Sequence, residues 1–197
     1  MPRKKDVNQR IRDERRESIL RVSGRMIAEK GIADIKISEI AEAANMSQGL
    51  LYRYYSSKEE LFTALVEERA ESLIKPLREV LNSSTDSASQ KLFNITEKML
   101  KDIVLNSDRH QLLWQALALP NNTNKIMTTM GAYLQGNLRN LVAEGQREGE
   151  IRDGNPDMLV VLYLSAMQGL ASSIHLFGQP ILDHFPDANS VYQILKS

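Results

Sequence analysis

The stretch from Ile37 to Lys58 constrains the fold of this chain more than any other, because it predicts two short helices joined by a tight turn. Apolar residues at helical spacing predict one helix over residues 37–44 and a second over residues 48–54. Asn45 suits the turn between them, since Asn tolerates a positive φ better than most non-glycine residues. Ser47 can cap the second helix by accepting a backbone N–H from its first turn. This is the layout of a helix-turn-helix, whose second helix enters the DNA major groove.

The same stretch resembles the signature of the TetR/AcrR family of transcriptional regulators. The sequence I-A-E-A-A-N-M-S-Q-G-L-L-Y-R-Y-Y-S-S-K-E-E-L follows the family pattern I-A-x-x-A-G-V-S-x-G-x-x-Y-x-Y-F-x-x-K-x-x-L. The residues that match in register are Ile40, Ala41, Ala44, Ser47, Gly49, Tyr52, Tyr54, Lys58 and Leu61. The alternative is a buried helical hairpin without a role in DNA binding, and this many matches in register favour the family.

Three positions depart from the family pattern. Asn45 stands where the family has a turn glycine, and Tyr55 replaces another aromatic residue. Lys36 lies near the position where the family has a Ser or Thr cap, and a lysine side chain cannot accept the capping hydrogen bond. Ser38 is the candidate replacement for that cap, so the start of the first motif helix stays open.

The resemblance implies an all-α fold of about nine helices in two domains. Residues 1–74 would hold an N-terminal arm and a three-helix DNA-binding head, with the helix-turn-helix over about 37–56. A long helix would link this head to a ligand-binding and dimerisation body over residues 75–197. No internal repeat and no strand pattern in the sequence competes with this interpretation.

Charge is divided unevenly along the chain, although the formal net charge is zero. Residues 1–58 hold 13 Lys or Arg against 8 Asp or Glu, hence a net charge of +5, and the remainder carries −5. A basic head on an acidic body favours nucleic acid contact at one end only. The chain has no cysteine and no apolar run after its basic N-terminus, which predicts a cytoplasmic protein without a signal peptide.

The helices outside the motif follow from apolar spacing and from Gly, Pro and polar breakers. Residues 1–12 are expected to be a flexible basic arm that follows DNA phosphates or solubilises the chain. Ser57 caps the linking helix, which should bend or end near Pro76. A polar loop is expected over residues 82–89. The other predicted helices cover residues 13–30, 87–105, 108–119, 123–148, 156–177 and 188–195.

The predicted helix over residues 156–177 is apolar nearly all round. Its uninterrupted apolar run is too short for a membrane span, so we expect one side to face the core and the other a partner subunit. The resemblance implies a homodimer through a four-helix bundle. The residues predicted for the dimer interface are Leu159, Leu162, Tyr163, Ala166, Leu170, Ile174 and Tyr192.

No catalytic grouping, metal-ligand spacing or phosphate-binding loop appears, so neither an enzyme nor a cofactor is predicted. His110, His175 and His184 lie far apart in the sequence and are interpreted as surface or packing residues, His175 with less certainty. The resemblance implies a ligand cavity in the body. The residues predicted to line it are Phe62, Phe93, Met99, Trp114, Gln115, Met127, Met130, Tyr133, Met167, Gln168 and His175. Ordinary core packing is the alternative for each apolar member.

The predicted function is that of a homodimeric, sequence-specific DNA-binding regulator, a repressor released from a palindromic double-stranded operator by a small apolar effector. Transcriptional activation, or a helical adaptor or enzyme without DNA binding, is the alternative. Gln48, Leu50 and Arg53 would reach base edges, whereas Tyr52 would pack on the head core. The residues predicted to contact DNA are Arg3, Lys4, Lys5, Lys36, Ser38, Ser47, Gln48, Gly49, Leu50, Tyr52, Arg53, Tyr54 and Lys58.

Overall fold

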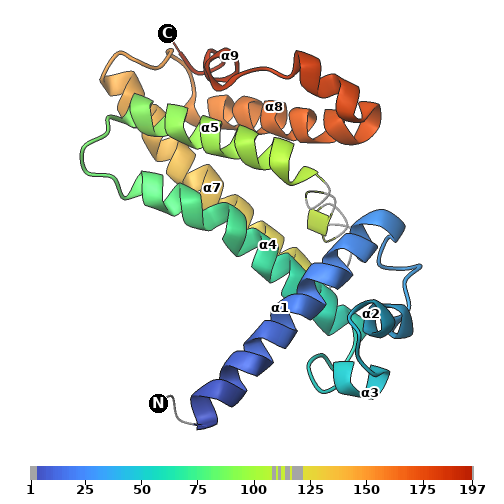
Figure 1. The fold of residues 1–197 in the computed structure, drawn as a ribbon. Helices are drawn as coiled ribbons and strands as arrows, with labels where there is room; N and C mark the ends of the chain where they lie inside the picture. Colours follow the sequence, from blue (N-terminus) through green and yellow to red (C-terminus); the bar gives the residue numbers. More distant parts are fainter. Residues whose placement is uncertain (1–3, 108–109, 111, 114–115, 117–121, 197) are drawn as a thin grey trace.

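The fold is all-α, as the sequence predicts, and a computed structural model describes it except at residues 1–3, 108–109, 111, 114–115, 117–121 and 197 (Figure 1). Side chains of residues 4–6 and 122–124 are also left undescribed. The described residues form eight α-helices, one 3-10 helix and no strand. The elements are α1 (Lys4–Lys30), α2 (Ile37–Ala43), α3 (Gln48–Leu51), α4 (Lys58–Leu81), α5 (Ala88–Leu105), α7 (Asn122–Arg147), α8 (Pro156–Phe177), η1 (Gln179–His184) and α9 (Ala188–Tyr192).

The head consists of α1, α2, α3 and the first turns of α4, which Figure 1 shows at the end of the molecule away from the C-terminus. Ile19 on α1, Ile40 on α2 and Leu51 on α3 are fully buried in one cluster. Leu61 and Phe62 at the start of α4 complete that cluster. The linking helix therefore begins as part of the head core.

The turn of the helix-turn-helix and the start of its second helix have the geometry that the sequence predicts, but the start of the first helix does not. Asn45 adopts a φ of 54°, and the Ser47 hydroxyl accepts a hydrogen bond from the Leu50 backbone N–H at 3.2 Å. At the start of α2 the Glu39 carboxylate, rather than Ser38, accepts the Lys36 backbone N–H at 2.8 Å. The second helix is shorter than predicted, because α3 ends at Leu51 and the chain continues as turns.

One prediction about the long helices is wrong, and one of the two alternatives for another, that α4 bends or ends near Pro76, is excluded. Residues 4–12 are not a flexible arm, because α1 already begins at Lys4. This segment contains no Gly or Pro, and the pairs Gln9–Asp13 (2.9 Å) and Arg10–Glu14 (3.8 Å) have the i, i+4 spacing that supports a helix. Likewise α4 does not end near Pro76 but continues to Leu81. Burial of its inner face in the body compensates for the bond that proline cannot make.

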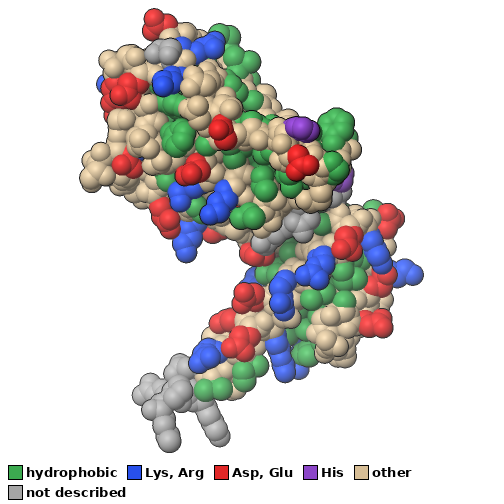
Figure 2. Space-filling view, turned by 45° about the horizontal axis from the view of Figure 1, so that its top comes forward, with side chains coloured by type: hydrophobic (Ala, Val, Ile, Leu, Met, Phe, Trp, Pro, Cys, Tyr) green, Lys and Arg blue, Asp and Glu red, His purple; other side chains and the backbone are tan. Residues whose placement is uncertain are grey.

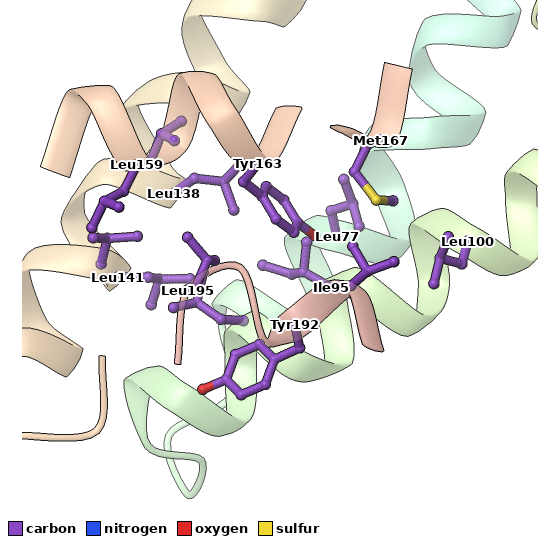
Figure 3. Close-up of a cluster of buried hydrophobic side chains, with 14 of the residues drawn as sticks. Leu77, Ile95, Leu100, Leu138, Leu141, Leu159, Tyr163, Met167, Tyr192 and Leu195 are labelled. Atoms are coloured by element: carbon purple, nitrogen blue, oxygen red, sulfur yellow. The ribbon is translucent and has the colours of Figure 1, made fainter. Parts of the chain in front are cut away.

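In the body, α5 and α7 pack on α4, α8 packs on α5 and α7, and α9 packs on α5. Figure 3 shows its core, in which Leu77 of α4 and Ile95 of α5 lie near Tyr163 of α8. The C-terminus closes this core, since the Arg152 backbone N–H donates to the Leu195 carbonyl at 3.0 Å. Asn155 caps α8 by accepting the Met158 backbone N–H at 3.1 Å, with Pro156 at the first helical position as predicted.

The head and the body have separate apolar clusters, and α4 runs through both. The domain boundary predicted at residues 74 and 75 therefore falls inside a continuous helix. The predicted helix over residues 108–119 lies largely outside the described residues. Of its described residues, Leu112, Leu113 and Ala116 are buried in the head cluster, whereas His110 is half-buried outside it.

Candidate DNA-binding surface and body cavity

The exposed side of α3 carries the residues predicted to contact DNA. Gln48, Gly49 and Arg53 are exposed, and Leu50 and Tyr54 are half-buried. Tyr52, expected against the head core, is instead 45% exposed, because its side chain points away from the cluster that Leu51 and Tyr55 fill. The exposed residues thus form a polar face on a short helix that the head core holds from behind.

The first turns of α1 lie beside α3 and enlarge that face. A groove of about 390 Å³ lies between the two helices. It is lined by Asn8, Ile11, Arg12, Arg15, Leu50, Arg53 and Tyr54. Three arginine side chains therefore border one groove, which suits an anionic backbone better than an apolar partner. Arg3, Lys4 and Lys5 lie outside the described side chains.

Tyr55 ties α1 to the helix-turn-helix. Its hydroxyl accepts a hydrogen bond from Arg16 Nε at 3.2 Å, and the Arg16 guanidinium lies 5.6 Å from the ring centroid. Burial raises the pKa of Tyr55, and the bond to Arg16 offsets part of that rise. Sequence reasoning treated Tyr55 only as an aromatic substitute and did not detect this anchor, whose two residues lie 39 positions apart.

Lys58 connects the linking helix to the loop between α1 and α2. Its ammonium group donates to the carbonyls of Ala33 and Ile35, both at 3.2 Å. Lys36 and Ser38, on the far side of this loop, are exposed. In this structure Lys58 therefore positions the loop, and a phosphate contact by Lys58 would compete with those two carbonyls.

Gly49 occupies open space. A Cβ placed on it would meet no heavy atom within 4 Å, and its φ is not positive. Packing within the described part of the chain therefore does not require a glycine here, although glycine destabilises a helix relative to alanine. A surface that approaches the first turn of α3 from outside would explain the glycine at this position.

The body contains a partly open cavity of about 230 Å³ between α4, α5, α7 and α8. Its lining residues are Leu73, Leu77, Met99, Ile103, His110, Leu113, Met127, Met130, Leu134, Leu164, Met167, Gln168 and Ala171. All of these except His110 and Gln168 are apolar. Five of the residues predicted for the pocket meet at this cavity, namely Met99, Met127, Met130, Met167 and Gln168.

The other residues predicted for the pocket lie elsewhere. Phe62 belongs to the head core, and Phe93 packs edge-to-face on Tyr192 with ring centroids 5.8 Å apart. Tyr133 lines a separate outer groove between α4 and α7, and His175 lines a cleft between α1 and α8. Apolar periodicity places a side chain on a buried face without telling which neighbour it meets. Trp114 and Gln115 lie outside the described residues.

A buried charged cluster lies beside the cavity. The guanidinium of Arg69 on α4, 1% exposed, forms a two-pronged ion pair with Asp102 on α5, in which Nη1 donates to Oδ1 at 3.0 Å and Nη2 donates to Oδ2. His110 Nε2 lies 3.0 Å from Asp102 Oδ2 and 3.2 Å from Arg69 Nη2. Asn106 Nδ2 donates to Asp102 Oδ1 at 2.9 Å.

This cluster holds Asp102 ionised. Burial opposes its ionisation, but the hydrogen bonds from His110 and Arg69, together with their charges, keep the pKa of Asp102 well below its usual range. Sequence reasoning assigned His110 a surface or packing role and did not single out Arg69 or Asp102. The only sequence signal was an arginine at a position where α4 should be apolar, one turn before Leu73.

The outer side of α8 exposes a band of apolar side chains. Five of the large apolar side chains that are exposed among the described residues lie on this helix: Met158, Val161, Leu162, Leu176 and Phe177. Figure 2 shows hydrophobic side chains gathered on the surface of the body. Leu162 is 49% exposed and Leu176 is 73% exposed, so no part of the described chain covers this band.

Four residues predicted for a dimer interface are instead core residues of the same chain. Leu159, Tyr163, Ile174 and Tyr192 are each at most 5% exposed. The Tyr163 hydroxyl lies 2.8 Å from the Thr96 hydroxyl, and burial raises the pKa of Tyr163 to about 12. All-round apolarity did not show which side of the helix faces inward. Of the predicted set, Leu162 is exposed, and Ala166 and Leu170 are half-buried.

By length and composition alone, α8 is long and apolar enough to cross a membrane. The short uninterrupted apolar run in its sequence predicts instead that it does not span one. Of its most apolar window, 28% is buried within the chain. Core helices of globular proteins commonly have this composition, and the inner face of α8 packs on α5 and α7.

Known families match both parts of this architecture. Residues 19–65 match the family model of bacterial regulatory proteins, tetR family, and residues 85–172 match that of the tetracyclin repressor-like C-terminal domain. The chain belongs to the TetR family. The match over residues 19–65 includes α2 and α3, the two helices of the helix-turn-helix, and the start of α4.

Two known regulators resemble parts of the chain. It is 30% identical over 108 residues to the HTH-type transcriptional activator FasR of Mycolicibacterium smegmatis, which covers 55% of this chain and 49% of FasR. It is 26% identical over 132 residues to the fatty acid metabolism regulator protein of Bacillus subtilis, which covers 66% of each. The chain thus spans between half and two thirds of the length of these relatives.

A solved structure shares the fold over nearly the whole chain. The crystal structure of AibR in complex with isovaleryl coenzyme A and operator DNA superposes with a TM-score of 0.74, covering 91% of this chain and 94% of AibR. Sequence identity is 18%, so the likeness concerns the fold.

Proposed function

We propose that this TetR-family regulator is a repressor that binds a specific operator through α3 and is released when a small, largely apolar ligand fills the body cavity. The observation that carries the proposal is a set of shared residues between the cavity and the head. Leu113 lines the cavity and is buried in the head cluster, and Met127 and Met130 line the cavity and pack against that cluster. A change in cavity shape therefore acts directly on groups that support the helix-turn-helix.

The physics of release requires the ligand to bind the two forms of the protein unequally. A ligand with equal affinity for the DNA-competent and DNA-incompetent forms does not shift the equilibrium between them. Because α4 runs from the head core to Leu73 and Leu77 at the cavity, its displacement would change the placement of α3. AibR, which is seen with both isovaleryl coenzyme A and operator DNA, supports the idea that this fold serves both partners.

A homodimer follows from the exposed band on α8. Five large apolar side chains on one helix make an apolar surface of the kind that marks an interaction site. A second copy of α8 against this band would cover it and would place two heads on half-sites of a palindrome. Residues 1–74 then act as the DNA-binding domain and residues 75–197 as the ligand-binding and dimerisation domain, in a cytoplasmic protein without catalytic activity.

Activation is the second candidate function, because FasR is named as a transcriptional activator. The position of the operator relative to the promoter decides between repression and activation. The same protein geometry therefore serves either function. Transcription from the regulated promoter with and without the protein distinguishes the two.

The experiment that tests specific recognition is selection from random duplex DNA. We expect an enriched inverted repeat whose half-sites are centred about 34–36 Å apart, one helical turn, or a multiple of that distance. Recovery of no enriched motif would contradict the proposal. An enriched site without inverted symmetry would retain DNA recognition but contradict the dimer.

A further inference from the structure

We propose that His110 is the residue that recognises the polar end of the ligand, and that Asp102 and Arg69 position it, so that the ligand is an apolar molecule with one oxygen-bearing end. The inference rests on the proposed function and adds the chemical class of the ligand. Its starting point is the cavity lining, in which His110 and Gln168 are the only side chains among the described residues that form strong hydrogen bonds. Gln168 is exposed, whereas His110 belongs to a buried cluster.

The cluster holds the Nε2 atom of His110 and leaves its Nδ1 atom without a contact in the cluster. Nε2 lies 3.0 Å from Asp102 Oδ2 and 3.2 Å from Arg69 Nη2, so both neighbours engage the same atom. Among the described residues, Nδ1 has no hydrogen-bond partner. The His110 side chain is 17% exposed and lines the cavity, so a ligand atom can reach the ring and provide the missing partner.

Asp102 and Arg69 are themselves held in place, which makes His110 a rigid recognition group. Each carboxylate oxygen of Asp102 accepts from Arg69, and Asn106 donates to Oδ1. Arg69 also donates to the Ser72 hydroxyl at 3.2 Å. The ring of His110 therefore cannot turn without breaking bonds to a buried ion pair, and such support is what orients a binding residue.

The chemistry of Nδ1 limits what the ligand end can be. In the neutral ring with its proton on Nε2, Nδ1 accepts a hydrogen bond from a hydroxyl group, and in the charged ring it donates to a carboxylate or carbonyl oxygen. An oxygen-bearing end satisfies both cases. The remainder of the ligand meets leucine, isoleucine and methionine side chains, so it is apolar. A cavity of about 230 Å³ exceeds the roughly 150 Å³ that suffices for benzene.

Two isosteric probes test the proposal, namely benzyl alcohol and ethylbenzene, which differ only in a hydroxyl in place of a methyl group. Benzoate is a third probe that reports an anionic end. We measure their affinities by calorimetry for the full chain and for His110→Gln. The glutamine amide nitrogen reaches about the position of histidine Nε2 and keeps the bond to Asp102, but nothing replaces Nδ1. The ratio of the benzyl alcohol affinity to the ethylbenzene affinity is compared between wild type and His110→Gln, and this comparison cancels the difference in hydrophobicity between the probes.

We expect the preference for benzyl alcohol or benzoate over ethylbenzene to fall about tenfold in His110→Gln, the worth of one hydrogen bond. His175→Gln, in the cleft between α1 and α8, should leave the ratio unchanged. The 15N signal of His110 Nδ1 should shift with benzyl alcohol but not with ethylbenzene. An equal preference in wild type and His110→Gln would overturn the inference, and so would failure of all three probes to bind.

The experiment distinguishes a failure of the proposed function from a failure of this inference. Probes that bind with the expected preference yet leave operator affinity unchanged would retain the role of His110 and reject ligand-controlled release. Probes that release DNA with no dependence on His110 would retain the proposed function and reject the role of His110.

Discussion

The head and the body use buried space in opposite ways. In the head, α1, α2 and α3 close on large aliphatic and aromatic side chains such as Ile19, Leu51 and Phe62, each without measurable exposure. In the body, a cavity of about 230 Å³ and a buried ion pair lie between equally apolar helices. A filled core resists deformation, whereas an unfilled one can change shape at low energetic cost. The head is thus suited to read DNA and the body to respond to a ligand.

The largest effect is expected from removing one side of the buried ion pair. Asp102→Leu leaves the Arg69 guanidinium buried without its counter-charge and should lower the free energy of unfolding by about 3–5 kcal/mol. Urea denaturation at pH 7 measures this loss. The double variant Arg69→Met, Asp102→Leu should recover most of it, because an apolar pair replaces the lone charge. A loss below about 1 kcal/mol in the single variant would show that the cluster is well hydrated.

The proposed dimer interface lies on the body, so a substitution there should weaken association without changing the head. Leu162→Asp places a carboxylate from each subunit at the proposed interface and should weaken association by about 3 kcal/mol, or a hundredfold. Light scattering at micromolar concentration should then report folded monomers. Leu105→Asp is the matched control, since Leu105 is 68% exposed and lies off α8. A wild-type chain that is monomeric at the same concentration would reject the interface.

DNA contacts depend on the head, so their loss should leave the body unchanged. Arg53→Ala should cost about 1–3 kcal/mol of operator binding and alter the preferred bases, because a bidentate contact to guanine would be lost. Tyr54→Ala should instead weaken binding to all sequences, as expected of a phosphate contact. Fluorescence anisotropy with the enriched site and a scrambled duplex measures both. Equal losses on the two duplexes for Arg53→Ala would argue against base readout.

The smallest effect is expected at Gly49, where one substitution separates the stability of the head from its affinity for DNA. Gly49→Ala meets no atom of the described chain and should stabilise α3 by about 0.5–1 kcal/mol. The same methyl group should reduce operator affinity if DNA approaches the first turn of α3. Thermal denaturation and operator titration of one preparation give both numbers. A variant that is more stable and binds DNA as well as wild type would show that Gly49 does not face the duplex.

The sequence predicted the head better than the body because its determinants are local. The positive φ of Asn45, the Ser47 cap and the capping of α4 by Ser57 each depend on residues within a few positions. The misjudged start of α1 is also local, since uninterrupted helix-forming residues outweighed the basic composition of an arm.

The body depends on contacts that no local pattern encodes. Arg69 and Asp102 are 33 positions apart, and only the packing of α5 on α4 brings them together. The same holds for α8, whose sequence is apolar on every side and does not show that Leu159 faces inward and Leu162 outward. The pocket that the family resemblance implied therefore included five cavity residues, but apolar spacing could not distinguish these from Phe93, which packs on Tyr192, or from Tyr133, which lines an outer groove.

The most direct test of the account is the affinity of the chain for its selected operator with and without a saturating ligand of the body cavity. Benzyl alcohol, or a tighter compound found by thermal shift, serves as the ligand. The account predicts that operator affinity falls by about 5–150-fold, and that DNA weakens ligand binding by the same factor. A ligand that binds the cavity and leaves operator affinity unchanged would contradict the coupling of body to head.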